Sequence, residues 1–353
     1  MTDPVLSHLD AAKWTFSTRR VDRACVAGSD RDFAAARPGD LILAQVHQLG
    51  QHQRVQLVTG RPSLLYPGDL VVLACGARYA PDQFEGHAKI DPDGADLLAG
   101  GGCIGRMVAR NERIKPATKM MPVARLLDAQ GAPVNLGRFA LPPADLSPEN
   151  PKIPAIFVLG AAMNSGKTLA TAQLSLGLRH AGYRVAALKG TGTGAFGDVN
   201  EYADTGAHWV ADFTDAGMVT TYREPLARVK AGMELLLDHA SQRGCQIAVM
   251  EIADGLFQRE TGALIADPWF SDRLAGLVFA CGDAVAAAGG VAVLDHHGLR
   301  PDVLTGILSC SPMAAAEAEA ATGVPVLRKD DLADPAEANG LAMRALIAPR
   351  QAA

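Results

Sequence analysis

Hydrophobic and polar positions follow two different patterns on either side of residue 150. Before it, apolar segments are short and follow turn residues: residues 40–46 come after Pro38-Gly39, and residues 70–75 come after Pro67-Gly68-Asp69. Short strands separated by Pro and Gly predict a small β barrel or sandwich. The same pattern predicts further strands at 54–58, 103–109 and 123–127.

After residue 150, apolar runs of strand length alternate with segments of helical period. Strands are predicted at 155–159, 184–188, 247–250, 274–280, 291–294, 303–308 and 324–327, and helices at 168–181, 226–243 and 312–322. This alternation predicts an α/β domain with a mainly parallel sheet and helices on both faces. Ligands of such sheets bind at the carboxyl ends of the strands.

A proline-rich segment separates the two patterns. Residues 141–154 read LPPADLSPENPKIP, with five prolines in fourteen residues. Proline neither continues a helix nor fills a central strand. We therefore expect a linker at 141–154, a β-rich N-terminal domain at 1–140 and an α/β domain at 155–353.

Composition narrows the class of protein. The 353 residues carry a net charge of −5 and only 5% aromatic side chains, which argues against a nucleic-acid-binding surface. Six scattered cysteines without a CxxC pair indicate reduced thiols. The N-terminus lacks a basic segment followed by an apolar one, and Asp283 and Gly289-Gly290 interrupt the most apolar stretch, 277–294. We expect a cytoplasmic protein that binds neither nucleic acid nor membrane.

One motif carries most of the chemical information. Residues 156–168 read IFVLGAAMNSGKT, a strand that leads through a loop into a helix. The phosphate-loop pattern is G-x(4)-G-K-[ST], but here five residues separate Gly160 from Gly166. Loop N–H groups and the helix dipole would bind phosphates, Lys167 would contact the β- and γ-phosphates, and Thr168 would hold Mg²⁺. The cofactor-binding residues predicted are Gly160, Asn164, Ser165, Gly166, Lys167, Thr168 and Leu169.

The G-x(5)-G-K-T spacing resembles dethiobiotin synthetases, a class of P-loop ATPases, and the likeness extends over residues 153–330. The resemblance implies that Lys189, after the second strand, reaches the phosphates or the substrate. It also implies that Glu251, after the third strand, helps to bind the metal. We therefore expect Lys167, Lys189 and Glu251 to be catalytic residues. We expect Thr168 and Glu251 to bind the metal. The same resemblance implies that the protein forms a homodimer.

Two positions depart from that family. Ala162 stands where the family has an aspartate that helps to bind metal, and Gly190 where it has a proline. The resemblance therefore carries over the fold and the phosphate cradle, and not the dethiobiotin substrate.

A second resemblance covers residues 190–217. This run resembles a P-loop family that includes D-amino-acid N-acetyltransferases and relatives of cyclic diphosphoglycerate synthetase. It implies substrate binding by Thr191, Thr193, Gly194, Asp204 and Asp212, where the aspartates would orient an amine or a metal. The alternatives are a flexible lid for the glycines and a helix cap or surface acid for Asp212.

A third cluster follows Glu251. Arg259 has the planar fork that clamps a carboxylate or phosphate, and Asp254 would orient a nucleophile. The alternative for Arg259 is a surface ion pair with Glu260.

Three functions remain open on these residues. The first is an ATP- and Mg²⁺-dependent enzyme, ligase or kinase-like, which activates a small-molecule carboxylate by phosphoryl transfer for ligation to an amine. The second is a coenzyme A-dependent N-acyltransferase whose loop binds the phosphates of acetyl-CoA or another acyl-CoA. The third is a nucleotide-dependent switch or metallochaperone NTPase. The absence of an N-K-x-D tetrapeptide favours adenine over guanine.

Overall fold

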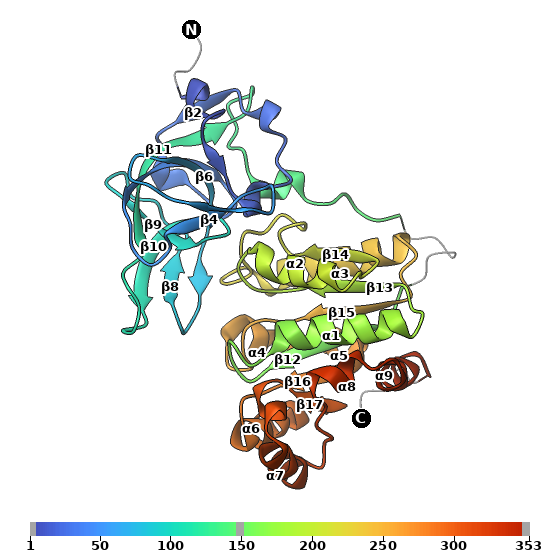
Figure 1. The fold of residues 1–353 in the computed structure, drawn as a ribbon. Helices are drawn as coiled ribbons and strands as arrows, with labels where there is room; N and C mark the ends of the chain where they lie inside the picture. Colours follow the sequence, from blue (N-terminus) through green and yellow to red (C-terminus); the bar gives the residue numbers. More distant parts are fainter. Residues whose placement is uncertain (1–4, 146–151, 348–353) are drawn as a thin grey trace. The chain divides into compact units, whose positions relative to one another are not determined.

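A computed structural model describes residues 5–145 and 152–347 (Figure 1). The chain forms two compact units. The first unit contains residues 5–142 together with Thr193–Phe196 and Phe213–Glu224, and the second contains the remaining described residues. Of the linker predicted at 141–154, residues 146–151 lie outside the described residues.

The first unit is built on a strand-rich sheet that closes on itself. Among its described residues, the pairings run β6–β3–β11–β9–β10 and return from β10 to β6. Its strands are β1 (Lys13–Trp14), β2 (Gly28–Asp30), β3 (Leu41–Gln48), β4 (Arg54–Gln56), β5 (Pro62–Leu64), β6 (Leu70–Cys75), β7 (Arg78–Tyr79), β8 (Phe84–His87), β9 (Ala95–Ala99), β10 (Cys103–Arg110) and β11 (Thr118–Leu127). Closure removes the unpaired edges of the central strands.

The local sequence explains where these strands begin. Gly39 and Gly68 have φ values of +90° and +95°, which only glycine adopts without strain, so each Pro-Gly pair turns the chain into β3 or β6. Side chains of β3 alternate between two apolar clusters: Ile42 and Ala44 pack in one, Leu41 and Leu43 in the other. The predicted strands 40–46, 70–75 and 103–109 are confirmed as β3, β6 and β10.

The second unit is a parallel six-stranded sheet in the order β14-β13-β15-β12-β16-β17. Its strands are β12 (Ala155–Gly160), β13 (Val185–Lys189), β14 (Trp209–Asp212), β15 (Ile247–Glu251), β16 (Leu274–Ala280) and β17 (Val303–Thr305). Its helices are α1 (Lys167–His180), α2 (Phe196–Asp204), α3 (Leu226–Gln242), α4 (Arg259–Ile265), α5 (Pro268–Arg273), α6 (Ala284–His296), α7 (Pro312–Thr322), α8 (Lys329–Ala333) and α9 (Pro335–Ile347).

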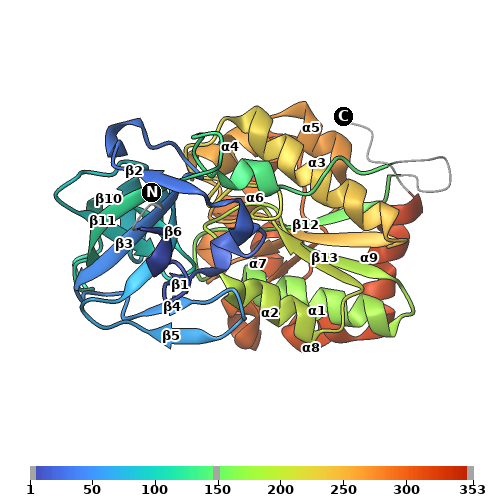
Figure 2. The same ribbon diagram turned by 90° about the horizontal axis from the view of Figure 1, so that it is seen from above.

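Helices cover both faces of this sheet. Figure 2 shows α3 and α5 on one side and α1, α2 and α8 on the other. Along β12, Ile156 and Val158 belong to the cluster that α1 covers, whereas the ring of Phe157 packs at a tilt against Phe270 of α5, with ring centroids 4.7 Å apart. The strand is buried on both faces, as a central parallel strand must be. The predicted α/β fold class with a preceding β-rich region is confirmed.

Several finer predictions are wrong. Residues 291–294 belong to α6 and not to a strand, because an Ala- and Gly-rich buried helix has the same continuous apolar run as a buried strand. Residues 324–327 contribute only an isolated bridge between Leu304 and Val326. The run 190–217 contains α2 and β14, two elements that the sequence pattern did not predict.

Candidate functional site

The loop between β12 and α1 has the backbone shape of a phosphate cradle. Asn164 has a φ of 60° and Gly166 a φ of 103°, so the chain turns sharply before the first helical residue. A Cβ atom on Gly160 would lie 2.4 Å from Oγ of Ser165, and one on Gly306 would lie 2.2 Å from the carbonyl oxygen of Ser165. Glycine at 160 therefore leaves room for the side chains of Ser165 and Lys167, and glycine at 306 lets its backbone approach that of Ser165. The N–H groups at the start of a helix form a ready anion-binding site.

Two polar side chains of the loop are buried. Lys167 is 5% exposed, and its Nζ donates to the carbonyl oxygens of Ala162 at 2.8 Å and Asp254 at 2.5 Å. Ser165 is also 5% exposed, and within residues 5–145 and 152–347 its Oγ has no hydrogen-bond partner. A buried hydroxyl without a partner is costly, so its place in this loop indicates a ligand oxygen.

A charged cluster lies at the carboxyl ends of β13 and β15. Nζ of Lys189 lies 3.2 Å from Oε1 of Glu251 and also donates to Asp198, in the first turn of α2. The hydroxyl of Tyr202 donates to the other carboxylate oxygen of Glu251. Lys189 and Glu251 are paired residues of adjacent parallel strands, so the sheet register alone brings their side chains together.

Charge pairing sets the ionisation of this cluster. Burial alone would lower the pKa of Lys189, but Glu251 and Asp198 outweigh it and raise that pKa. Burial would likewise raise the pKa of Glu251, but Lys189 and Lys167 hold it below its usual value. Burial lowers the pKa of Lys167, against the attraction of Glu251 and Asp254. Lys189 and Glu251 are therefore both charged near neutral pH.

The oxygen atoms beside α1 suit a magnesium ion. Oγ1 of Thr168 donates to Oδ1 of Asp198 at 3.2 Å, and Lys189 is paired with both Asp198 and Glu251. The described residues contain no group of three or more His, Cys, Asp and Glu side chains placed to hold a metal. One hydroxyl and two carboxylates are nevertheless what Mg²⁺ takes from a protein when phosphates and waters complete its six ligands. Thr168, Asp198 and Glu251 would hold it.

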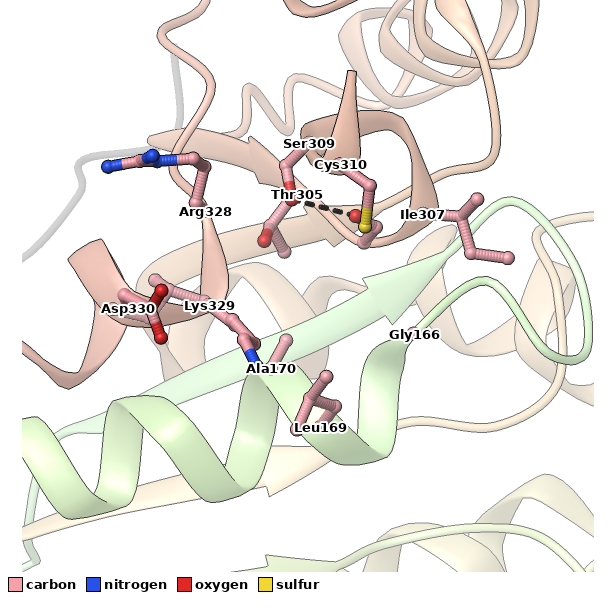
Figure 3. A pocket seen from close by; sticks show the side chains of 12 residues that line it. Gly166, Leu169, Ala170, Thr305, Ile307, Ser309, Cys310, Arg328, Lys329 and Asp330 are labelled. Atoms are coloured by element: carbon pink, nitrogen blue, oxygen red, sulfur yellow. Dashed lines mark hydrogen bonds between the residues drawn. The ribbon is translucent and has the colours of Figure 1, made fainter. Parts of the chain in front are cut away.

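An apolar cavity of about 230 Å³ adjoins the loop. Figure 3 shows its lining: Gly166, Leu169 and Ala170 from the start of α1, Ile307 and Cys310 from the segment after β17, and Arg328, Lys329 and Asp330 at the start of α8. Its apolar walls and a few polar groups at one end are typical of a pocket for a flat ring. Leu169, predicted as cofactor-binding, lines this cavity.

The remaining predicted residues are dispersed. Oγ1 of Thr191 donates to the carbonyl oxygen of Ala253 at 2.6 Å, close in sequence to Asp254, whose own carbonyl accepts from Lys167. Asp212 ends β14 and is fully buried. Asp204 ends α2 and is exposed, as is Arg259, the first residue of α4.

Thr193 and Gly194 belong to the first unit. They pair there with Thr220 and Val219, with 3.4 Å between the hydroxyls of Thr193 and Thr220. Glu260 is buried and bonded to Gln258, so the surface ion pair considered for Arg259 does not describe its environment.

Sequence reasoning missed Asp198 and Tyr202. Both lie in α2, a helix that the sequence pattern did not predict. The signal that could have found Asp198 is an acid in the first turn of a short amphipathic segment, nine positions after Lys189.

Comparisons with known proteins add little. No family model matches the chain, and no curated protein matches it. Among solved structures, it is similar to the signal recognition particle 54 kDa protein of Aeropyrum pernix K1, solved in complex with GDP, with a TM-score of 0.36 and 18% identity. The match covers 57% of this chain and 52% of that one, about half of its length.

Within the described residues, no helix is long and apolar enough to cross a membrane.

Proposed function

We propose that this chain binds ATP with Mg²⁺ and transfers the γ-phosphoryl group to a small-molecule acceptor. The observation that carries the proposal is the convergence, beside the start of α1, of two lysines with a hydroxyl and two carboxylates: Lys167, Lys189, Thr168, Asp198 and Glu251. Phosphoryl transfer requires cationic side chains that contact the phosphate oxygens, and oxygen ligands nearby that hold a metal ion.

Each part of the second unit has a role in this proposal. The loop of Gly160 to Thr168 would cradle the β- and γ-phosphates, with Oγ of Ser165 donating to one of their oxygens. The adenine would occupy the cavity beside Leu169 and Ile307. Lys167 and Lys189 would stabilise the charge that develops on the transferred group. Mg²⁺ at Thr168, Asp198 and Glu251 would supply further positive charge for the phosphate oxygens.

The acceptor proposed is a carboxylate. A carboxylate oxygen would attack the γ-phosphorus while the bond to the bridging oxygen of ADP breaks, which forms an acyl phosphate and releases ADP. An amine would then attack the acyl carbon and lose a proton, and inorganic phosphate would leave. The resemblance to dethiobiotin synthetases supports the attack by the amine, and the positions of Lys167 and Lys189 support the transfer of the phosphoryl group.

Coenzyme A is the competing ligand for the same loop. Its phosphates would fit the backbone N–H groups, but an acyl transfer needs no metal. The hydroxyl of Thr168 and the carboxylates of Asp198 and Glu251 favour a phosphate ligand that arrives with Mg²⁺, because these are the oxygen ligands that Mg²⁺ takes.

Isothermal titration of the purified chain with ATP plus Mg²⁺, GTP plus Mg²⁺ and acetyl-CoA tests the proposal. We expect ATP to bind, and Lys167→Ala to lose the binding and lower any phosphoryl transfer by about 10²–10³-fold. Lys115→Ala, at an exposed lysine of the first unit, is the matched control. Trapping with hydroxylamine, which converts an acyl phosphate to a hydroxamate, then screens carboxylate acceptors. Binding of acetyl-CoA with no response to ATP would overturn the proposal in favour of acyl transfer.

A further inference from the structure

A cavity of about 380 Å³ lies in the first unit at the hairpin of β4 and β5. Its lining includes Lys13, Arg54, Arg61, Leu64 and Tyr66, all of which belong to the first unit. The volume falls within the range of ligand pockets, roughly 300 to 1,000 Å³. None of these residues takes part in the proposed phosphoryl transfer, so the cavity is without a role so far.

Strand pairing brings the cations of this cavity together. In the antiparallel hairpin, Arg54 of β4 lies opposite Leu64 of β5. Figure 2 shows β1 beside this hairpin, where Thr15 forms a bridge with Leu57. Nζ of Lys13, in β1, donates to the carbonyl oxygen of Leu64 at 2.7 Å. An ammonium and a guanidinium from distant parts of the chain therefore adjoin the same residue.

Positive charge exceeds negative charge at this cavity. Lys13 is paired with Asp69, whose carboxylate also accepts a backbone N–H at 2.8 Å. Within residues 5–145 and 152–347, neither Arg54 nor Arg61 pairs with a carboxylate, and Arg61 donates to a neighbouring backbone carbonyl oxygen at 3.2 Å. Both arginines are exposed, and a guanidinium stays charged at every accessible pH. Three cations and one carboxylate leave two positive charges without a counter-charge.

An exposed aromatic ring lies beside these charges. Tyr66 is 59% exposed and Leu64 is 49% exposed, and both line the cavity. Nζ of Lys13 lies 5.8 Å from the centroid of the Tyr66 ring. An aromatic ring at a cavity offers a surface on which a flat ring of a ligand packs, at offset or edge-to-face geometry. The cavity therefore combines groups for an anion with a surface for a ring.

We propose that this cavity binds a phosphate monoester that carries an aromatic ring, with Arg54 and Arg61 at the phosphoryl oxygens and Tyr66 against the ring. A phosphate monoester has about two negative charges at pH 7, which matches the two positive charges without a counter-charge. The planar forks of the two arginines suit phosphate oxygens, to which they donate paired hydrogen bonds. A carboxylate brings one negative charge and binds more weakly. The inference does not rest on the proposed phosphoryl transfer.

Isothermal titration with phenyl phosphate, inorganic phosphate and benzoate, without nucleotide or Mg²⁺, tests this inference. The full-length Lys167→Ala chain is used, because the phosphate loop also attracts anions. We expect phenyl phosphate to bind at millimolar concentration or below, and both other anions to bind about fivefold more weakly or worse. Arg54→Gln should weaken phenyl phosphate by about tenfold, and Arg54→Gln/Arg61→Gln by more. Tyr66→Leu should remove the preference for phenyl phosphate over inorganic phosphate.

Arg113→Gln, at an exposed arginine outside the cavity, is the matched control and should bind phenyl phosphate like the parent chain. Unweakened binding by Arg54→Gln/Arg61→Gln would overturn the assignment of the site. Equal affinity for benzoate and phenyl phosphate would overturn the phosphate class.

Equal affinity for inorganic phosphate and phenyl phosphate would overturn the requirement for a ring, and the absence of phenyl phosphate binding would overturn the proposal as a whole. ATP binding by the unaltered chain is measured separately, so a failure of the proposed phosphoryl transfer is distinguished from each of these results.

Discussion

The phosphate loop of the second unit and a cavity of the first unit, lined by His87 and Arg223 among others, share one feature and differ in another. Each contains a non-glycine residue with positive φ, Asn164 in the loop and Arg223 in the cavity. The loop is contiguous in sequence, from Gly160 to Thr168. The cavity joins β8 to a segment that follows it by more than a hundred residues.

The two regions also treat buried charge differently. In the second unit, Lys189 and Glu251 are buried and stay charged because they face each other. In the first unit, burial and the neighbouring Arg78 lower the pKa of the half-buried His52 to about 4, so that this histidine is neutral near pH 7. The charged pair of the second unit can attract a phosphate or a metal, whereas the neutral ring of His52 packs against Phe84 with ring centroids 5.6 Å apart. The comparison teaches that opposite charges keep one buried group ionised, while burial keeps the other neutral.

Breaking the charge pair is expected to have the largest effect. Lys189→Met removes the cation that is bonded to both Glu251 and Asp198, and we expect a loss of about 3 kcal/mol in the free energy of unfolding. The double variant Lys189→Met/Glu251→Gln should recover more than half of that loss. Mg²⁺ should stabilise Lys189→Met more than the unaltered chain, since the ion would take the place of the lysine. Denaturant unfolding measures the stability of both variants and the effect of Mg²⁺. An unchanged unfolding midpoint for Lys189→Met would show that the buried charge pair does not stabilise the second unit.

The second effect concerns His52. In the unfolded chain this histidine takes up a proton with a pKa near 6.5, and in the folded chain only near 4. As pH falls below 6.5, the unfolded state therefore gains protons first and folding weakens. Between pH 7 and pH 5 this contributes a loss of about 2 kcal/mol. His52→Gln should lack this part of the pH dependence, and an identical pH profile in both chains would contradict the assignment.

The smallest expected effect tests where the base of the nucleotide binds. Cys310 is exposed and lines the cavity beside Leu169, whereas burial raises the pKa of Cys103 and Cys281 to about 12. We expect iodoacetamide to modify Cys310 first, and saturating ATP with Mg²⁺ to slow that modification by about tenfold, since a bound base shields the thiol. Mass spectrometry of peptides measures the rate at each cysteine. If bound ATP left the Cys310 rate unchanged, the base would have to lie elsewhere.

The fold class was predictable because each unit repeats one sequence pattern along its length. Strand–helix alternation predicted the parallel sheet, and the Pro-Gly turns predicted β3 and β6. The prediction at 291–294 failed because an apolar run has no period that separates a buried helix from a buried strand, and the small residues of α6 make both equally compatible.

What the sequence by itself determined is the phosphate loop and its neighbours at the ends of strands. Gly160 to Thr168 form one contiguous turn, and Lys189 and Glu251 end strands whose positions the alternation predicts. Only the tertiary structure decided that Asp198 and Tyr202 join Lys189 and Glu251, that Thr193 and Gly194 pack in the first unit, and that Arg223 meets His87. The physical reason is that these contacts depend on how distant segments pack together, and no periodicity or spacing along the chain records that packing.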